Sequence, residues 1–322
     1  MRIADVHRSS AVLAVAAVFL VMTCFAAAQE VRPGSGKDLR PTGKHQGVAE
    51  ANAPSAREIN EPNDAPPSRD ANRLRPRTNG ISWHGGPVMH GTVPIYFIWY
   101  GNWANNTATS LLPTLISDLN GSSYEHINTT YYDSTAHVAG AMALQGQAND
   151  NYSQGTSLSD ASIETIVANH CQALGGCDSS GIYFVLTSED VDETSGFCTQ
   201  YCGWHTDGTI SGKDIKYAFV GNAARCLSAC AEQSTSPNNN AGADAMASII
   251  AHESEEAISD PDLNAWYDSR GNENADKCAW TFGNMSTASN GSLYNFTGAS
   301  GTRWLIQRNW VNASGGYCAM SY

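Results

Sequence analysis

The sequence has 322 residues, a net charge of −13 at pH 7 and 15% charged residues, while 42% of its residues are hydrophobic. This composition suits one large or two small folded domains and excludes a coiled coil, a collagen-like repeat and a wholly disordered chain. From residue 81 onward the chain carries 7 basic and 23 acidic residues. So acidic a surface repels phosphate backbones, which argues against nucleic acid as a partner and suits an exported or cation-binding protein.

The first 80 residues differ in composition from the rest of the chain. Arg2 and Arg8 precede an apolar stretch at 11–25, and three alanines follow at 26–28, a pattern typical of a secretory signal peptide. Residues 29–80 contain no aromatic residue and many Pro, Arg, Asn and Glu, so we expect a disordered linker or a propeptide there, and favour the linker. The mature protein is therefore expected to be secreted and to have no stable membrane span.

From residue 81 onward the hydrophobic pattern becomes that of a globular domain, which we place at 81–322. Period-2 and continuous apolar runs predict strands at 93–100, 181–187, 217–221 and 302–310. Helical spacing and cap residues predict helices at 111–119, 157–174 and 244–259. Strands mixed with helices in this order predict a single α/β or α+β domain with a mixed sheet.

Eight cysteines remain once the signal peptide is removed: Cys171, Cys177, Cys198, Cys202, Cys226, Cys230, Cys278 and Cys318. An even number in an exported protein indicates disulfides. We expect the first two to pair with each other, the two C-x-x-x-C pairs to join each other, and the last two to pair. The alternative is a four-cysteine zinc site built from the two C-x-x-x-C pairs, which is disfavoured because the usual zinc spacing is C-x2-C.

The predicted helix at 244–259 carries the run His-Glu-Ser-Glu-Glu at 252–256. His252 and Glu256 are four residues apart, so they share a helix face and can bind one metal ion. Glu253 follows the first ligand directly, where the helix of a metalloprotease holds the general base that takes a proton from water. The familiar motif is H-E-x-x-H; with Glu256 in place of the second histidine, the set suits zinc and is also compatible with a harder ion.

A second acidic run, Asn-Glu-Asn-Ala-Asp at 272–276, follows this helix. Glu273 is our candidate for a third metal ligand, and Asp276 for a further ligand or for a residue that orients His252. The run resembles the third-ligand signature of thermolysin-like metallopeptidases, although its final acid is one residue closer. The sequence therefore predicts a zincin-like active-site helix and a zinc-dependent hydrolase or peptidase.

Two alternatives stay open from the residues alone. The acidic helix can be a solvated face of a non-catalytic extracellular protein, or the acids can form a structural calcium site from Asp260, Asp262, Asp268, Glu273 and Asp276. We expect His205 to be structural or exposed. No G-x-S-x-G elbow, Walker loop or dinucleotide-binding glycine motif occurs, so a serine hydrolase and a nucleotide-binding enzyme have no support.

Several stretches taken together resemble the EXORDIUM / phosphate-induced protein 1 family of secreted plant proteins, which also occurs in microbes. They include the segments at 84–88, 95–103, 185–191 and 219–222, the run Gly196-Phe197-Cys198, and the Pro-Asn-Asn-Asn run at 237–240. They follow one another in the same order over roughly residues 81–320. The resemblance implies an extracellular or cell-wall location and a link to growth control, and it carries no established catalytic activity.

The helix with His252 and Glu253 departs from the plant pattern that this resemblance implies. Either this branch retains an enzymatic activity or the acids are incidental, and the partner is expected to be an extracellular peptide or a cell-wall component. The plant pattern also lacks Cys171 and Cys177, which implies that these two pair with each other.

Overall fold

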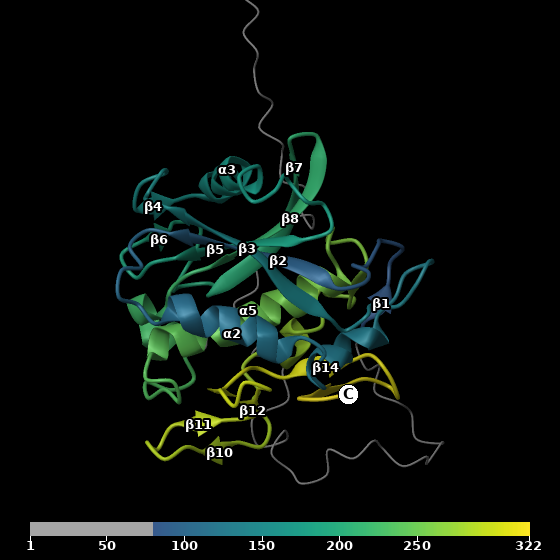
Figure 1. The fold of residues 1–322 in the computed structure, drawn as a ribbon. Coiled ribbons are helices and arrows are strands. Elements are labelled where there is room, and N and C mark those ends of the chain that lie inside the picture. The colour runs from purple at the N-terminus through teal and green to yellow at the C-terminus, as the bar shows by residue number, and fades with distance from the viewer. Residues whose placement is uncertain (1–79) are drawn as a thin grey trace, which may run out of the picture. The chain divides into compact units, whose positions relative to one another are not determined.

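The computed structural model describes residues 80–322 and arranges them around a five-stranded sheet in the order β3-β2-β5-β8-β7 (Figure 1). The first four strands run parallel, and β7 is antiparallel to β8, to which a tight turn connects it. The strands are β2 (Val93–Tyr100), β3 (Met142–Asp150), β5 (Ile182–Thr187), β7 (Gly203–Ile210) and β8 (Lys213–Val220). The predicted signal peptide at 1–28 and all but the last residue of the predicted linker or propeptide at 29–80 lie outside the described residues.

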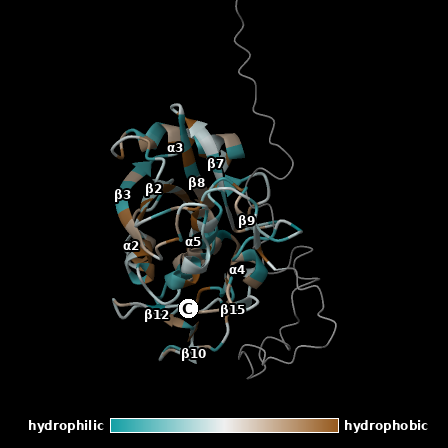
Figure 2. Cartoon of the chain, turned by 90° about the vertical axis from the view of Figure 1, so that its right-hand side faces the viewer, coloured by the Kyte–Doolittle hydropathy of each residue, from teal (hydrophilic) through white to brown (hydrophobic). Residues whose placement is uncertain are grey.

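The inner strands are buried because their sequences are continuous apolar runs. Every residue of β5 is buried, and so is all of β2 except Pro94, as expected for parallel strands that helices cover on both faces. Phe97 on β2 packs edge-to-face on Phe184 of β5, with ring centroids 6.0 Å apart. In Figure 2 the central strands carry much of the hydrophobic colouring, whereas β7 at the edge is paler.

Helices cover both faces of the sheet (Figure 1). On one face lies α3 (Asp160–Cys171), and on the other lie α2 (Ala108–Leu119) and α5 (Ala241–Ser259). Ser159 begins α3 with a reciprocal capping box, and the Asn240 side chain caps α5 by accepting the Ala243 N–H. Residues 242–259 of α5 are all buried, so its acids do not form a solvated face.

The remaining elements are short and lie mostly in the C-terminal part of the chain. The residues from 286 onward form two-residue and three-residue strands that pair antiparallel, on the side of α5 away from the sheet (Figure 1). These short elements are β1 (Ser82–Trp83), η1 (Glu125–Thr130), β4 (Ser157–Leu158), β6 (Asp192–Glu193), η2 (Ala223–Cys226), α4 (Leu227–Cys230), β9 (Trp266–Tyr267), η3 (Asp276–Cys278), β10 (Ser286–Thr287), β11 (Leu293–Tyr294), β12 (Phe296–Thr297), β13 (Arg303–Trp304), β14 (Asn309–Val311) and β15 (Tyr317–Ala319).

The fold class predicted from the sequence is confirmed: residues 80–322 belong to one compact unit with mixed helices and sheets. The expected strand at 302–310 is instead two short strands, β13 and β14. Two strands of the five-stranded sheet were not predicted, β3 and β7, because each lies at an edge of the sheet and carries polar residues. No helix in the described part of the chain combines the length and apolar character that a membrane span requires.

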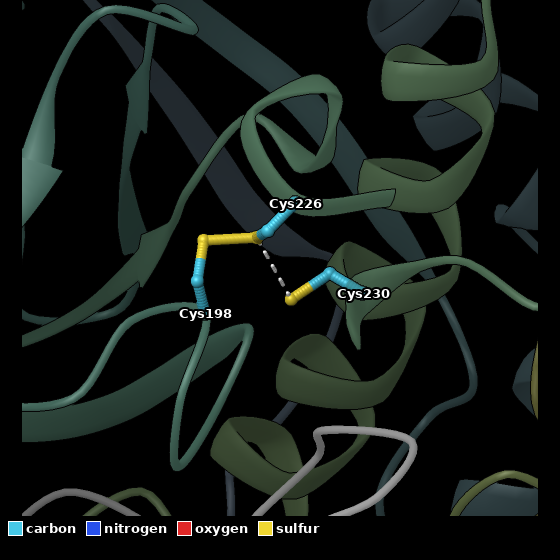
Figure 3. Close-up of side chains that lie close together, drawn as sticks. All are labelled: Cys198, Cys226 and Cys230. Carbon is cyan, nitrogen blue, oxygen red and sulfur yellow. Dashed lines mark hydrogen bonds between the residues drawn. A yellow bond between two sulfur atoms is a disulfide. The ribbon is translucent and has the colours of Figure 1, made fainter. Parts of the chain in front are cut away.

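Four disulfides form: Cys171–Cys177, Cys198–Cys226, Cys202–Cys230 and Cys278–Cys318. The first and last pairs and the joining of the two C-x-x-x-C pairs were expected, and the structure adds which cysteine of one pair bonds to which cysteine of the other. Figure 3 shows the Cys198–Cys226 bond with the Cys230 sulfur 3.6 Å from that of Cys226. The sulfurs are close enough together to suggest a metal site, but each is already bonded to another sulfur, so the four-cysteine zinc alternative is wrong.

Candidate metal centre

The candidate site begins on one face of α5. His252, Glu253 and Glu256 are completely buried, and each offers an atom within 4.8 Å of an atom of the other two. Nε2 of His252 lies 3.1 Å from Oε1 of Glu256, because residues four apart on a helix stand one turn above each other. The helix therefore presents the two expected ligands and the expected base on a single side.

The edge strand β7 packs against this face of α5, and a glycine makes the close approach possible. A Cβ atom on Gly203 would lie 2.5 Å from Cγ2 of Ile249 and 3.2 Å from Oε1 of Glu253. His205 is two residues further along and points to the same face of the sheet. Its Nε2 lies 3.1 Å from Oε2 of Glu273 and 3.8 Å from Oε2 of Glu256.

His205 is not exposed, because its side chain is buried and belongs to the cluster. The signal that would have found it is the alternation of Gly203, His205 and Asp207, which places all three on one face once β7 is recognised as a strand. The run was not recognised as a strand because it contains only two large apolar residues.

The loop after α5 brings Glu273 and Asp276 to the same place. The Asp276 N–H donates to Oε1 of Glu256 at 2.9 Å, and the Glu273 N–H donates to Oδ2 of Asp276 at 3.4 Å. Oδ1 of Asp276 lies 3.9 Å from Nε2 of His252. Asp276 thus orients Glu256 through its backbone, contacts His252 more loosely, and holds the loop that carries Glu273.

Two buried asparagines, Asn274 and Asn128, link this loop to α5 by hydrogen bonds. Nδ2 of Asn274 donates to the carbonyl oxygen of Glu255 at 3.1 Å and to Oδ1 of Asn128 at 2.9 Å. Nδ2 of Asn128 donates to the same carbonyl at 3.0 Å. Asn128, Asn274 and Glu255 are fully buried, so these bonds fix the position of the neighbouring Glu273 relative to α5.

Burial determines the protonation state of His205. Burial and, to a smaller extent, the neighbouring His252 lower the pKa of His205 to about 3, so the imidazole is neutral and in the form that binds metals. Burial raises the pKa of Glu256, and the repulsion from Asp276 adds to this, while His252 acts in the opposite direction. Within residues 80–322 no lysine or arginine forms an ion pair with Glu256, and its Oε2 accepts no hydrogen bond.

The spacing of these atoms suits a bound cation. Ligands about 2.1 Å from a tetrahedral ion stand roughly 3.4 Å from one another, and the four histidine–carboxylate distances run from 3.1 to 3.9 Å. The atoms form two sets of three that share Glu256, one with His205 and Glu273, the other with His252 and Glu253. Imidazole and carboxylate ligands together suit zinc and its neighbours among the transition metals.

A second pair of buried acids lies beside the candidate centre. Glu125 from η1 and Glu255 from α5 are fully buried, and Oε2 of Glu255 accepts a hydrogen bond from Nδ2 of Asn309 at 2.6 Å. Burial raises the pKa of Glu125 to about 8. Burial and the neighbouring Glu125 also raise the pKa of Glu255, so the fold favours the protonated form of both acids.

The acids of the alternative calcium site are separated in the structure. Asp260 accepts the backbone N–H groups of Asn264 and Ala265 at the end of α5. Asp262 pairs with Lys216 at 3.0 Å, and Asp268 accepts backbone bonds within its own loop. None of the groups in residues 80–322 whose ligand atoms lie close enough for one ion combines these three acids with Glu273 or Asp276.

These features define a disulfide-linked α+β protein in which an edge strand, a buried helix and a loop bring two histidines and several carboxylates together. The chain belongs to the phosphate-induced protein 1 family, because the family model described as "Phosphate-induced protein 1 conserved region" matches residues 81–320. The resemblance seen in the sequence is thereby confirmed.

Named relatives come from plants. Protein EXORDIUM-like 3 of Arabidopsis thaliana is 31% identical over 280 residues, which cover 74% of this chain and 82% of the relative. Protein EXORDIUM-like 5 of the same plant is 28% identical over 71% of this chain and 75% of the relative. Protein PHOSPHATE-INDUCED 1 of Nicotiana tabacum is 26% identical over 72% of this chain and 85% of the relative. No solved structure gives a significant match.

Proposed function

We propose that this member of the family is a secreted, metal-dependent hydrolase whose buried cluster binds one divalent cation, with zinc as the preferred ion. The observation that carries the proposal is the position of Glu256, which lies between two histidines with a buried Oε2 that accepts no hydrogen bond from the described residues. A buried carboxylate is costly without a nearby positive charge, and a divalent ion would provide one.

In this proposal His205, His252, Glu256 and Glu273 hold the ion, and Asp276 positions Glu256. A bound zinc ion supplies Lewis acidity, which polarises a carbonyl group and lowers the pKa of water. Glu253 accepts the proton of the attacking water as general base and passes it to the leaving group. Its place against the backbone of Gly203 keeps the carboxylate next to the ligands.

The four disulfides support an extracellular location, because such bonds persist in oxidising compartments. The signal peptide predicted at 1–28 supports the same location. The names of the relatives state no activity, so the proposed hydrolysis rests on this chain's own residues.

A second candidate function has an observation of its own. His252, Glu253 and Glu256 are 0% exposed, and structural metal sites are closed whereas catalytic ones keep a position open. The alternative is therefore a non-catalytic extracellular or cell-wall binding protein that the metal stabilises, with calcium as the alternative ion.

The test is metal content and hydrolysis measured side by side for the wild type, Glu253→Gln, His252→Ala and the exposed control Glu189→Gln. Glu253→Gln keeps the size of the side chain but cannot accept a proton. It should keep the ion and the fold and lose about 10²–10⁴-fold in turnover, while His252→Ala should lose both ion and activity. The control should match the wild type in every measurement.

Two results separate the candidates. Zinc bound at one equivalent in a protein that cleaves neither a mixed peptide library nor a small ester supports the structural role. Metal binding by His252→Ala that equals that of the wild type contradicts the proposed site itself.

A further inference from the structure

The outer edge of β7 has no partner strand within residues 80–322. In the described part of the chain the five-stranded sheet ends at β7, whose single partner is β8, in the register Gly203 to Val220 and His205 to Ala218. Just before this ladder the Gly221 N–H donates to the Cys202 carbonyl at 3.3 Å. In an antiparallel ladder, residues that bond to the partner alternate with residues whose N–H and C=O point away from it. Gly203, His205 and Asp207 therefore direct their backbone groups outward.

These same residues face the candidate centre. Gly203 lies against Glu253, and the His205 side chain reaches Glu273 and Glu256. Because the directions of side chains and of backbone hydrogen bonds both alternate with a period of two, the outward backbone edge runs alongside the cluster. A chain that paired with this edge would lie next to the proposed base and ligands.

The edge carries donors that require a partner. Gly203 and His205 are buried, yet no hydrogen bond joins their outward N–H groups to another segment of residues 80–322. Nearly all buried backbone N–H groups in native proteins are hydrogen-bonded. The strand then becomes accessible, because residues 206–208 are half-buried and Thr209 is exposed. An edge of this kind is a template for a further strand.

We propose that an extended peptide binds along β7 as an added strand. It pairs with the outward backbone groups of Asp207 and Thr209, where the strand is accessible, and extends from there toward His205 and Gly203. Binding in this way recognises the peptide backbone itself and leaves side chains to pockets on either side. It places one peptide bond of the bound chain beside Glu253. The substrate class of the proposed hydrolase is then a peptide. This assignment of the substrate rests on the proposed function, whereas the docking of the peptide does not.

The edge can be changed at one position without touching the cluster. Asp207→Pro removes the outward N–H of residue 207, and proline is tolerated at the free side of an edge strand. Asp207→Ala is the matched control, because it removes the same carboxylate and keeps the N–H. Both changes are made in the full chain that also carries Glu253→Gln, loaded with zinc, so that bound peptide is not cleaved.

The probe is a fluorescent octapeptide library of mixed sequence, compared with the same library N-methylated at alternate amides. Fluorescence anisotropy should show binding about tenfold weaker for Asp207→Pro and within about twofold of the parent for Asp207→Ala, as expected for one lost hydrogen bond. The N-methylated library should bind at least tenfold more weakly to the parent. Zinc content and melting temperature of each variant confirm that the site is intact.

Equal binding of both libraries to the parent would overturn docking along β7, and that comparison needs no edge variant to fold. Equal binding by the proline and alanine variants would overturn it as well. Failure of the proposed function looks different, since it appears as missing zinc or missing hydrolysis of a small ester while the discrimination between the libraries persists.

Discussion

The two parts of the described chain on either side of residue 260 are stabilised in different ways. Residues 80–259 form long strands and helices whose side chains make up most of the apolar core. Residues 260–322 form strands of two or three residues and a single turn of helix. The candidate centre takes His205, His252 and Glu256 from the first part and Glu273 from the second. The candidate centre therefore combines residues from the packed core of 80–259 with a residue from a loop of 260–322, and this loop depends on other interactions for its position.

Those other bonds are polar and covalent. Asp118 of α2 accepts the indole N–H of Trp304 at 2.9 Å and the Ser300 hydroxyl at 2.8 Å. Nδ2 of Asn295 donates to the carbonyl oxygens of Phe282 and Ile306. The disulfide between residues 278 and 318 joins the start of this part to its end. Short strands cannot bury enough surface to be stable alone, so fixed bonds take over.

The largest effect is expected from a cavity in the first part. Phe184 is fully buried in the middle of the sheet, so Phe184→Ala should lower the free energy of unfolding by about 3–5 kcal/mol. Chemical denaturation monitored by circular dichroism measures it. A loss below 1 kcal/mol would show that the apolar sheet is not the main source of stability.

The second-largest effect on stability is expected from removing the Cys278–Cys318 disulfide. Removal of a native disulfide costs about 2–5 kcal/mol, so Cys278→Ser and Cys318→Ser should each lower the melting temperature, and the double variant should be little worse than either. Hydrogen exchange should rise mainly after residue 260. Additive losses would show that the two cysteines are not partners in solution.

A polar tie between the two parts should have a smaller effect on stability and a specific effect on metal binding. Asn274→Ala removes the bonds to Glu255 and Asn128 and should cost about 1–3 kcal/mol. Because Glu273 then loses its fixed position, zinc affinity should fall by about 10–100-fold. Competitive titration with a chelator measures it, with the exposed Asn149→Ala as control. Unchanged affinity would show that the loop holds Glu273 without this tie.

The smallest effect, counted for each pH unit, concerns the end of α5. Burial raises the pKa of Asp260 from 3.8 to about 7, although its backbone hydrogen bonds oppose the shift. The folded state therefore favours the protonated acid, and this contribution is complete below about pH 4 and is lost as pH rises through 7. Relative to Asp260→Asn, the wild type should lose on the order of 1 kcal/mol of stability for each pH unit between pH 4 and 7. A wild type that instead gains stability over this range would contradict the shift.

Most residues of the candidate centre could be recognised in the sequence, but one, His205, could not. The four-residue spacing of His252 and Glu256 specifies a shared helix face wherever that helix lies, and the run at 272–276 is recognisable by its acids. His205 is 47 residues before His252 in sequence, and no local pattern links the two. The hairpin of β7 and β8 brings them together, because its edge strand packs on α5 through Gly203.

The sequence by itself determined what depends on short spacings and composition: the mixed α+β class, the central strands, the helix with its His-Glu run, the first and last disulfides and the family. Only the tertiary structure decided which chemical groups meet. It buried the acids of α5, whose composition alone suggests a solvated face, and it directed Asp260, Asp262 and Asp268 to other partners. Burial and long-range contacts arise from packing between distant segments, and no local pattern encodes them.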